Sequence, residues 1–241
     1  MVDFFNSPRF TKKILMNDIA LNISMLRQKI PSSVKIVAVS KTKPVSDIMV
    51  AYNTGHRSFG ENRVKEILAK KDQLPGDIEW HFIGHLQSNK VKYIVPFITM
   101  IQSVDSAKLL SVINQEAEKT GRIVDCLLQF HIAKEETKFG FNLEEITQLL
   151  ESEDFKKLRN VNLCGVMGMA TFTDNMVQVG EEFIFLRNYF KALKEKYFQE
   201  YEDFKEISMG MSGDYLTAVN EGSTIVRIGG LIFGKRETKL S

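Results

Sequence analysis

The stretch Val34–Pro44, VKIVAVSKTKP, contains the feature from which the fold can be predicted. Its first half is a run of apolar residues, which is typical of a buried β-strand. Its second half is polar, with Ser40, Lys41, Thr42 and Lys43 in a row. A lysine that directly follows a hydrophobic strand is either ordinary surface or an amine at the rim of a pocket. In the second case, partial desolvation makes the amine a nucleophile.

The same pattern of a short apolar strand followed by an amphipathic helix repeats along the chain. Such alternation predicts a parallel sheet with right-handed crossovers. We predict strands at Lys35–Val39, Arg57–Gly60, Ile78–Ile83, Met100–Val104, Val124–Phe130, Leu163–Gly168, Ile207–Met209 and Thr224–Ile228. We predict helices at Thr11–Lys29, Ser46–Asn53, Arg63–Lys71, Ser106–Thr120, Leu143–Glu151 and Val177–Tyr197.

Eight such units in 241 residues favour a closed (β/α)8 TIM barrel, with the first helix as an addition at the N-terminus. An open, doubly wound sheet is the alternative. Its dinucleotide-binding form is weakened because no GxGxxG motif follows an early strand. The chain has no low-complexity segment, no short repeat and no linker rich in Pro, Gly or Ser. We therefore expect residues 1–241 to form a single domain.

The composition points to a cytoplasmic protein without disulfides. With 32 basic and 30 acidic residues, the net charge of +2 argues against electrostatic binding of nucleic acid. The N-terminus lacks the pattern of a secretory signal, and no apolar run is long enough to span a bilayer. Cys126 and Cys164 lie in apolar runs without CxxC spacing, so we expect buried thiols in a reducing compartment.

Two loops near the C-terminus have the composition of a phosphate site. After the seventh strand, Ser212 is predicted to cap a helix that begins near Asp214 and to direct free backbone N–H groups toward an anion. After the eighth strand, Gly229 and Gly230 lack β-carbons, so their amides can approach a phosphate closely. Each feature alone has an ordinary explanation, as a helix cap or a strand end. Barrel enzymes often hold phosphate in these two loops, and together they favour a phosphate site.

A lysine at one strand end and a phosphate site across the barrel predict a phosphorylated aldehyde held as a Schiff base. Pyridoxal phosphate is the common cofactor of this kind. Arg227 precedes the glycine pair and is placed to donate a hydrogen bond to the pyridine nitrogen. Its charge would disfavour protonation of that nitrogen and weaken the electron sink of the ring. An ordinary surface position is the alternative explanation for Arg227.

A metal site is not predicted. His81 and His85 are four residues apart, but Gly84 and the strand-like segment around them do not form a helical pair of ligands. No HExxH motif and no cysteine pair occurs.

Several segments resemble the pyridoxal phosphate homeostasis family, also called YggS/PROSC-type proteins. They are VAVSKTKP, FGENRVKE, WHFIGHLQSNKVKYI, KFGF, GVMGMA and SMGMSGDYLTAVNEGSTIVRIGGLIFG. The resemblance covers about 37–234 and implies a barrel similar to the N-terminal domain of alanine racemase. It implies pyridoxal 5′-phosphate bound to Lys41 as an internal aldimine. The implied neighbours of the cofactor are Ser212, Gly229 and Gly230 at the phosphate, Arg227 at the ring nitrogen, and Asn62 nearby.

The resemblance implies a monomer that binds, buffers or delivers the cofactor and influences amino-acid and keto-acid balance, without an established reaction. Apo-enzymes that receive the cofactor would be its partners. Three positions depart from the family: Gly230 replaces the usual Thr or Ser, Arg63 a common tyrosine, and His131 a common asparagine. Loss of one hydroxyl contact at Gly230 predicts phosphate retention weaker by about 1 kcal/mol. Lys43 is expected to face solvent or to make a secondary contact with the cofactor.

Two enzyme hypotheses remain open from the sequence. The first is a racemase or decarboxylase that acts on a small amino acid. Such enzymes add a C-terminal β-domain, for which we expect no room before Ser241, and a second proton-transfer group, for which Tyr215 and His131 are the candidates. The second is an aldolase for phosphorylated sugars, with Lys41 as its Schiff-base lysine.

Overall fold

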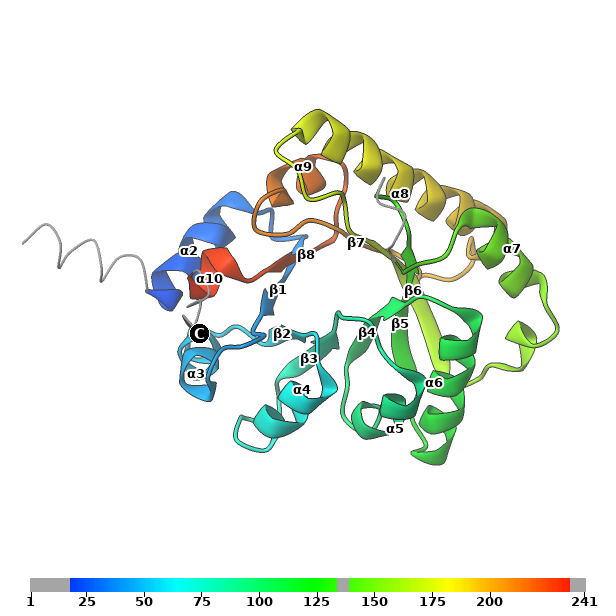
Figure 1. Ribbon diagram of the computed structural model, residues 1–241, viewed down its shortest axis with the longest axis horizontal. Helices are drawn as coiled ribbons and strands as arrows, with labels where there is room; N and C mark the ends of the chain where they lie inside the picture. Colours follow the sequence, from blue (N-terminus) through cyan, green and yellow to red (C-terminus); the bar gives the residue numbers. More distant parts are fainter. Residues whose placement is uncertain (1–17, 134–138, 235–241) are drawn as a thin grey trace, which may run out of the picture.

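Eight short apolar segments form the parallel strands of a closed barrel in the computed structural model, which describes residues 18–133 and 139–234 (Figure 1). The strands follow one another in chain order around the barrel, and β8 pairs with β1 to close it. They are β1 Lys35–Val39, β2 Ser58–Glu61, β3 Glu79–Phe82, β4 Met100–Val104, β5 Val124–Phe130, β6 Val161–Gly168, β7 Glu206–Ser208 and β8 Ile225–Ile228. The prediction of a (β/α)8 barrel is confirmed, and the open sheet is excluded.

Each strand is followed by a helix on the outside of the barrel (Figure 1). The helices are α2 Ile19–Lys29, α3 Val45–Asn53, α4 Val64–Lys71, α5 Val91–Ile94, α6 Ala107–Lys119, α7 Leu143–Glu151, α8 Met176–Tyr197, α9 Tyr215–Asn220 and α10 Gly230–Phe233, with 3-10 turns at Ser88–Lys90 and Phe155–Lys157. All eight predicted strands are present, with ends that differ by no more than two residues. The short helices α5 and α10 were not predicted, whereas α9 is the helix expected to begin near Asp214.

The N-terminal helix begins later than predicted. The side chain of Asp18 accepts a hydrogen bond from the backbone N–H of Leu21 at 3.0 Å, so it caps the helix and Ile19 is its first residue. Asp18 was expected inside a helix that starts at Thr11. Residues 11–17 lie outside the described part of the chain. Residues 1–10 and 235–241, at the two ends of the predicted domain, also lie outside it. The prediction of one domain over 1–241 therefore stays a prediction.

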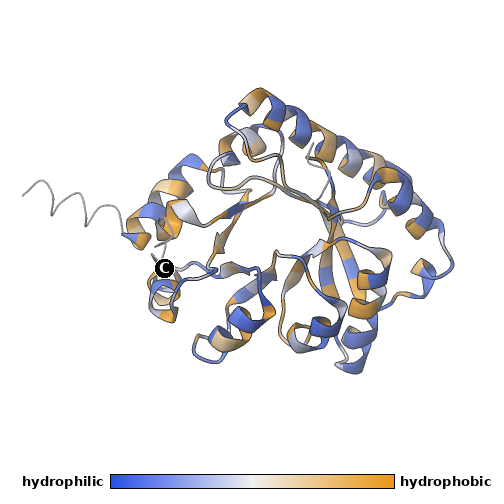
Figure 2. Ribbon diagram, viewed as in Figure 1, coloured by the Kyte–Doolittle hydropathy of each residue, from blue (hydrophilic) through white to orange (hydrophobic). Residues whose placement is uncertain are grey.

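Apolar side chains fill two separate regions on either side of the strands. One large cluster packs the helices against the outer face of the barrel, and Figure 2 shows apolar and polar positions alternating around these helices. A smaller cluster, which contains Val37, Met100 and Met167, fills the barrel interior. Cys126 belongs to the outer cluster and Cys164 to the inner one, and both are free thiols, as predicted. No helix in the described ranges is long and apolar enough to cross a membrane.

We predict that Gly165→Ala strongly destabilises the barrel. Gly165 has φ +149°, and an added β-carbon would overlap the carbonyl of Glu206 on β7, with the Glu206 nitrogen only 2.8 Å away. Backbone atoms of a paired strand cannot move aside, so the free energy of unfolding should fall by about 3 kcal/mol or more. Urea denaturation measures the effect. Gly76→Ala, where nothing lies within 4 Å, is the matched control. An equal, small effect in both variants would contradict the explanation.

Candidate functional site

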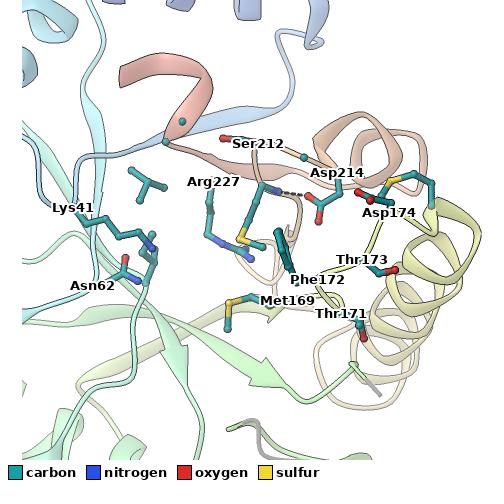
Figure 3. A pocket seen from close by; sticks show the side chains of 17 residues that line it. Lys41, Asn62, Met169, Thr171, Phe172, Thr173, Asp174, Ser212, Asp214 and Arg227 are labelled. Atoms are coloured by element: carbon teal, nitrogen blue, oxygen red, sulfur yellow. Dashed lines mark hydrogen bonds between the residues drawn. The ribbon is translucent and has the colours of Figure 1, made fainter. Parts of the chain in front are cut away.

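A cavity of about 350 Å³ opens at the carboxyl ends of the strands, where barrel proteins carry their ligands (Figure 3). All six residues singled out from the sequence line it: Lys41, Asn62, Ser212, Arg227, Gly229 and Gly230. In Figure 3, Lys41 and Asn62 lie on one side and Arg227 faces them from β8. The fold thus brings together residues from the two ends of the chain.

The two lysines of the SKTK segment have different surroundings. Lys41 follows β1, and its side chain extends into the cavity toward Asn62 (Figure 3). Lys43 is half-buried, and its Nζ donates a hydrogen bond to the carbonyl oxygen of Phe233 at 2.8 Å, at the end of α10. Lys43 is thus only partly exposed and is not among the residues that line the cavity, so the expected secondary contact with a cofactor stays a prediction. Its hydrogen bond stabilises the last helical turn.

The loops after β7 and β8 meet at the first turn of α10. The prediction that Ser212 caps the helix near Asp214 is wrong: the hydroxyl of Ser212 accepts a hydrogen bond from the N–H of Leu231 at 3.4 Å. Asp214 is itself the residue before α9, and its carboxylate accepts from the N–H of Met211. Ser212 is drawn to α10 because the first N–H groups of a helix have no partner within the helix.

The two glycines at the start of α10 have different space around them. A β-carbon at Gly229 would lie 3.1 Å from the carbonyl oxygen of Val39, so this glycine permits close packing on β1. At Gly230 the nearest atom would be the hydroxyl oxygen of Ser212, at 3.8 Å. A larger residue therefore fits at Gly230, toward the side where Ser212 and the amides of α10 meet.

Arg227 is buried, which excludes the surface explanation. It is 3% exposed, and its guanidinium donates to the hydroxyl of Ser208 at 2.7 Å and to the carbonyl oxygen of Gly168 at 2.9 Å. Burial lowers the pKa of Arg227 to about 10, while the carboxylate of Asp214 opposes this shift. The guanidinium is thus still a cation at neutral pH, and it is fixed at the floor of the cavity.

Behind Arg227, a chain of hydrogen bonds crosses the barrel interior. The hydroxyl of Ser208 donates to Oε1 of Gln102 at 2.7 Å, and Nε2 of Gln102 lies 3.0 Å from Nδ1 of His81. Arginine carries only donors, so the direction of the chain is fixed from that end: Ser208 accepts from Arg227, and His81 accepts from Gln102. His81 must then be neutral with its proton on Nε2. Burial agrees, because it lowers the pKa of His81 to about 3.

The sequence interpretation missed this polar chain. Its signal was the presence of Gln102 and Ser208 in predicted barrel strands. Both are completely buried, and polar side chains in the barrel interior are unfavourable unless they are hydrogen-bonded.

Asn62 provides an unsatisfied acceptor at the cavity wall. Its Oδ1 is buried and has no hydrogen-bond partner within the described residues. A β-carbon at Gly84 would lie 2.5 Å from the Asn62 carbonyl oxygen, so Gly84 lets the Asn62 backbone pass close by. A ligand with a donor group in the cavity would satisfy Asn62.

One wall of the cavity comes from the loop between β6 and α8, of which the sequence interpretation noted only the first part. Its residues in the lining are Met169, Thr171, Phe172, Thr173 and Asp174, together with Met176 at the start of α8. Glu182 of α8 is 2% exposed and accepts hydrogen bonds from the N–H and the hydroxyl of Thr171, at 2.6 and 2.7 Å. The ring of Phe172 is 96% exposed at the rim.

The candidate second bases do not reach the cavity. Tyr215 is 7% exposed at the start of α9, and neither it nor His131 is among the lining residues. His85 lies outside as well: its Nδ1 is 2.7 Å from Asp105, and its ring stacks on Phe139 at 3.9 Å. The described residues contain no group of three or more His, Cys, Asp or Glu that could hold a metal ion.

Comparison with known proteins identifies the family. The family model described as alanine racemase, N-terminal domain, matches residues 14–237. The pyridoxal phosphate homeostasis protein of Synechocystis sp. is 38% identical over 213 residues, covering 86% of this chain and 94% of that protein. The human protein of the same name is 37% identical over 213 residues, covering 84% of this chain and 77% of the human one. The chain belongs to the pyridoxal phosphate homeostasis protein family.

Solved structures agree with this assignment. PipY of Synechococcus elongatus, without PLP, is 35% identical and has a TM-score of 0.84, with 90% of this chain and all of PipY covered (100%). The structure of PipY with PLP bound has a TM-score of 0.81. Alanine racemase of Clostridium difficile is 14% identical, with a TM-score of 0.69. The superposition covers 92% of this chain and 57% of the racemase chain. That last likeness shows a shared barrel fold alone.

We predict that stability falls as the pH is lowered from 7 to 5, because of two buried histidines. Burial lowers the pKa of His56 to about 4 and that of His81 to about 3. In this window the unfolded chain takes up protons that the folded chain does not, so the free energy of unfolding decreases with pH. The decrease is about 2 kcal/mol for each histidine.

Denaturation of variants at pH 7 and pH 5 measures this effect. His56→Gln and His81→Gln should each have a smaller difference between the two pH values. An unchanged difference in both buried-histidine variants would contradict the assignment.

Proposed function

We propose that this protein binds pyridoxal 5′-phosphate in the cavity, as a Schiff base with Lys41, and that it buffers or carries the cofactor. One observation carries the proposal: a single cavity contains Lys41 on one side and Arg227 opposite it, together with the phosphate-site residues predicted from the sequence, Ser212, Gly229 and Gly230. The relatives' names, pyridoxal phosphate homeostasis protein, and the PLP-bound structure of PipY support it.

Each lining residue has a distinct part in this proposal. The hydroxyl of Ser212 and the backbone amides of Gly229 and Gly230, at the start of α10, would hold the phosphate. Arg227 would donate to the ring nitrogen from the floor, and Asn62 would accept a hydrogen bond near Lys41. The unsatisfied Oδ1 of Asn62 and the open space at Gly230 fit a phosphorylated ring compound. Bound pyridoxal phosphate supplies an electrophilic carbonyl carbon with which an amine condenses.

The cavity favours binding over turnover. A cationic Arg227 at the ring nitrogen weakens the electron sink that many pyridoxal phosphate enzymes use. Two-base proton transfer needs a second group on the opposite face of the ring, and Tyr215 and His131 do not line the cavity. The relatives' names state cofactor homeostasis and no reaction, which supports neither a racemase nor an aldolase.

The proposal extends to the setting of the protein. We place it in the cytoplasm as a monomer that releases pyridoxal phosphate to apo-enzymes and so affects vitamin B6 and amino-acid balance. The support for this part is the balanced charge, the two free thiols and the family resemblance.

We predict that Lys41→Ala abolishes the absorbance band of the Schiff base while the fold is kept, because the side chain lies in the cavity and not in the core. Lys43→Ala should keep the band, since Lys43 contacts Phe233 instead. The measurement is the visible spectrum after incubation with pyridoxal phosphate, with circular dichroism as the check of the fold. A band that survives in Lys41→Ala, or an unmodified protein that never develops one, would overturn the proposal.

We predict that Gly230→Thr slows release of the cofactor. The restored hydroxyl adds one hydrogen bond to the phosphate, about 1 kcal/mol, which corresponds to roughly fivefold in the dissociation rate. Gly230→Ala is the matched control, because a β-carbon fits there without strain but brings no donor. Release is followed as transfer to an excess of an apo-enzyme that depends on pyridoxal phosphate. Equal rates for the two variants would show that the hydroxyl makes no contact.

A further inference from the structure

Three charged side chains form a cluster behind the strand end that carries Lys41. Nζ of Lys70, on α4, lies 2.7 Å from Oε1 of Glu61 at the end of β2, and 3.5 Å from Oε2 of Glu66. Glu61 is completely buried and Lys70 is 8% exposed. None of the three lines the cavity, so the cluster acts on the site only through other residues.

The cluster holds the backbone on both sides of Lys41. Nζ of Lys70 donates to the carbonyl oxygen of Ser40 at 3.0 Å, which belongs to the peptide unit before Lys41. Oε2 of Glu66 accepts from the N–H of Thr42 at 2.7 Å, which belongs to the peptide unit after it. A residue has only two soft backbone dihedrals, and fixing both neighbouring peptide planes fixes them. The direction in which the Lys41 side chain leaves the backbone is therefore set by Lys70 and Glu66.

The same loop contains an unfavourable backbone conformation. Thr42 has a φ of +65°, and no other non-glycine residue in the described ranges has a positive φ. This backbone conformation is unfavourable for a β-branched residue. The N–H of this residue is the group that donates to Glu66, and hydrogen bonds to a charged acceptor are the stronger kind. The contact thus stabilises a turn that would otherwise relax beside Lys41.

Stability alone is a weak explanation for the cluster. Burial raises the pKa of the Glu61 carboxyl, against the hydrogen bonds from Lys70 and Ser40, so the carboxylate is costly to keep charged. Its Oε2 has no hydrogen-bond partner in the described part of the chain. Buried ion pairs often stabilise a fold no better than apolar side chains of the same size. A role in fixing geometry accounts for charges at this place.

We propose that Glu66 and Lys70, supported by Glu61, are positioning residues that aim the Lys41 amine at its carbonyl partner in the cavity. This inference rests on the proposed function. It separates two events: capture of the ring and phosphate, which the Arg227 side of the cavity provides, and bond formation at Lys41, which needs the cluster. The step joins Nζ of the Lys41 amine to the carbonyl carbon of pyridoxal phosphate by a carbon–nitrogen double bond, and the carbonyl oxygen leaves as water together with the two hydrogens of the amine.

The test compares Glu66→Ala and Lys70→Met with the unmodified protein. The rate of Schiff-base formation from pyridoxal phosphate should fall by about tenfold or more, because a misdirected nucleophile reacts slowly. The affinity for 4′-deoxypyridoxine phosphate, which has the same ring and phosphate but no aldehyde, should stay within about twofold, since its contacts are remote from the cluster. Glu66→Gln keeps an oxygen that accepts from Thr42 and should recover most of the rate.

Lys71→Met is the matched control. Lys71 follows Lys70 on α4, but it pairs with Asp72 and lies over the ring of Phe97, so both measurements should match the unmodified protein. Amide hydrogen exchange at Thr42, in protein without cofactor, gives a readout independent of binding. The Thr42 amide should be protected in the unmodified and Lys71→Met proteins and should exchange rapidly in Glu66→Ala.

The outcomes separate the inference from the proposed function. Cluster variants that form the Schiff base at the normal rate, or that lose affinity for the analogue as much as rate, overturn the positioning role. An unmodified protein that binds neither pyridoxal phosphate nor its analogue overturns the proposed function, and the inference with it. An unmodified protein that binds the analogue but forms no Schiff base overturns the role of Lys41, and with it the Schiff-base part of the proposed function and the positioning role of the cluster.

Discussion

The pairing of β1 with β8 is the constraint on which the cavity depends. Val37 lies opposite Arg227 and Ala38 opposite Ile228, so the loops that follow these strands leave the barrel side by side. This brings Lys41 next to the glycine pair, although the two segments come from opposite ends of the chain. Gly229 permits the close packing on Val39, since a β-carbon there would press on the Val39 backbone. An open sheet of the same strands would leave the lysine and the glycines far apart.

Buried hydrogen bonds hold charged side chains in place on both sides of this junction. On the β8 side, Arg227 donates hydrogen bonds to Ser208 and Gly168. The hydrogen bonds that continue from Ser208 through Gln102 to His81 fix which group donates and which accepts. On the β1 side, Lys70 and its two carboxylate partners hold the loop that contains Lys41. Both arrangements place costly polar groups in the interior, and most of their polar atoms are hydrogen-bonded, although Nε2 of His81 and Oε2 of Glu61 have no partner within the described residues. A ligand that enters the cavity therefore meets donors that are already oriented, and binding needs little rearrangement.

Much of the fold followed from the sequence because it depends on local periodicity. Three predicted strands, Lys35–Val39, Met100–Val104 and Val124–Phe130, have the observed ends. The prediction failed where tertiary contacts decide. Ser212 looked like the cap of the next helix, but barrel closure brings the start of α10 within its reach instead. The four-residue helix α10 is itself too short to leave a periodic signal.

The six residues predicted for the site do gather in one cavity, because they lie near or after the carboxyl ends of strands that the barrel places together. The supporting residues were not predictable in the same way. The link from Arg227 to His81 joins four strands, and no spacing in the sequence indicates that Gln102 meets Ser208. The contact of Lys70 with the Ser40 carbonyl needs the helix after β2 to lie across the end of β1. Such contacts depend on the register between strands, which the sequence of any one strand does not contain.

The central claim is that Lys41 is the residue that bonds to pyridoxal phosphate. Treating the loaded protein with borohydride makes that bond permanent, and peptide mapping by mass spectrometry then locates it. The account predicts the added mass on Lys41 alone, within the segment VSKTKP. Modification of Lys43 or of any lysine outside the cavity in place of Lys41 would contradict it.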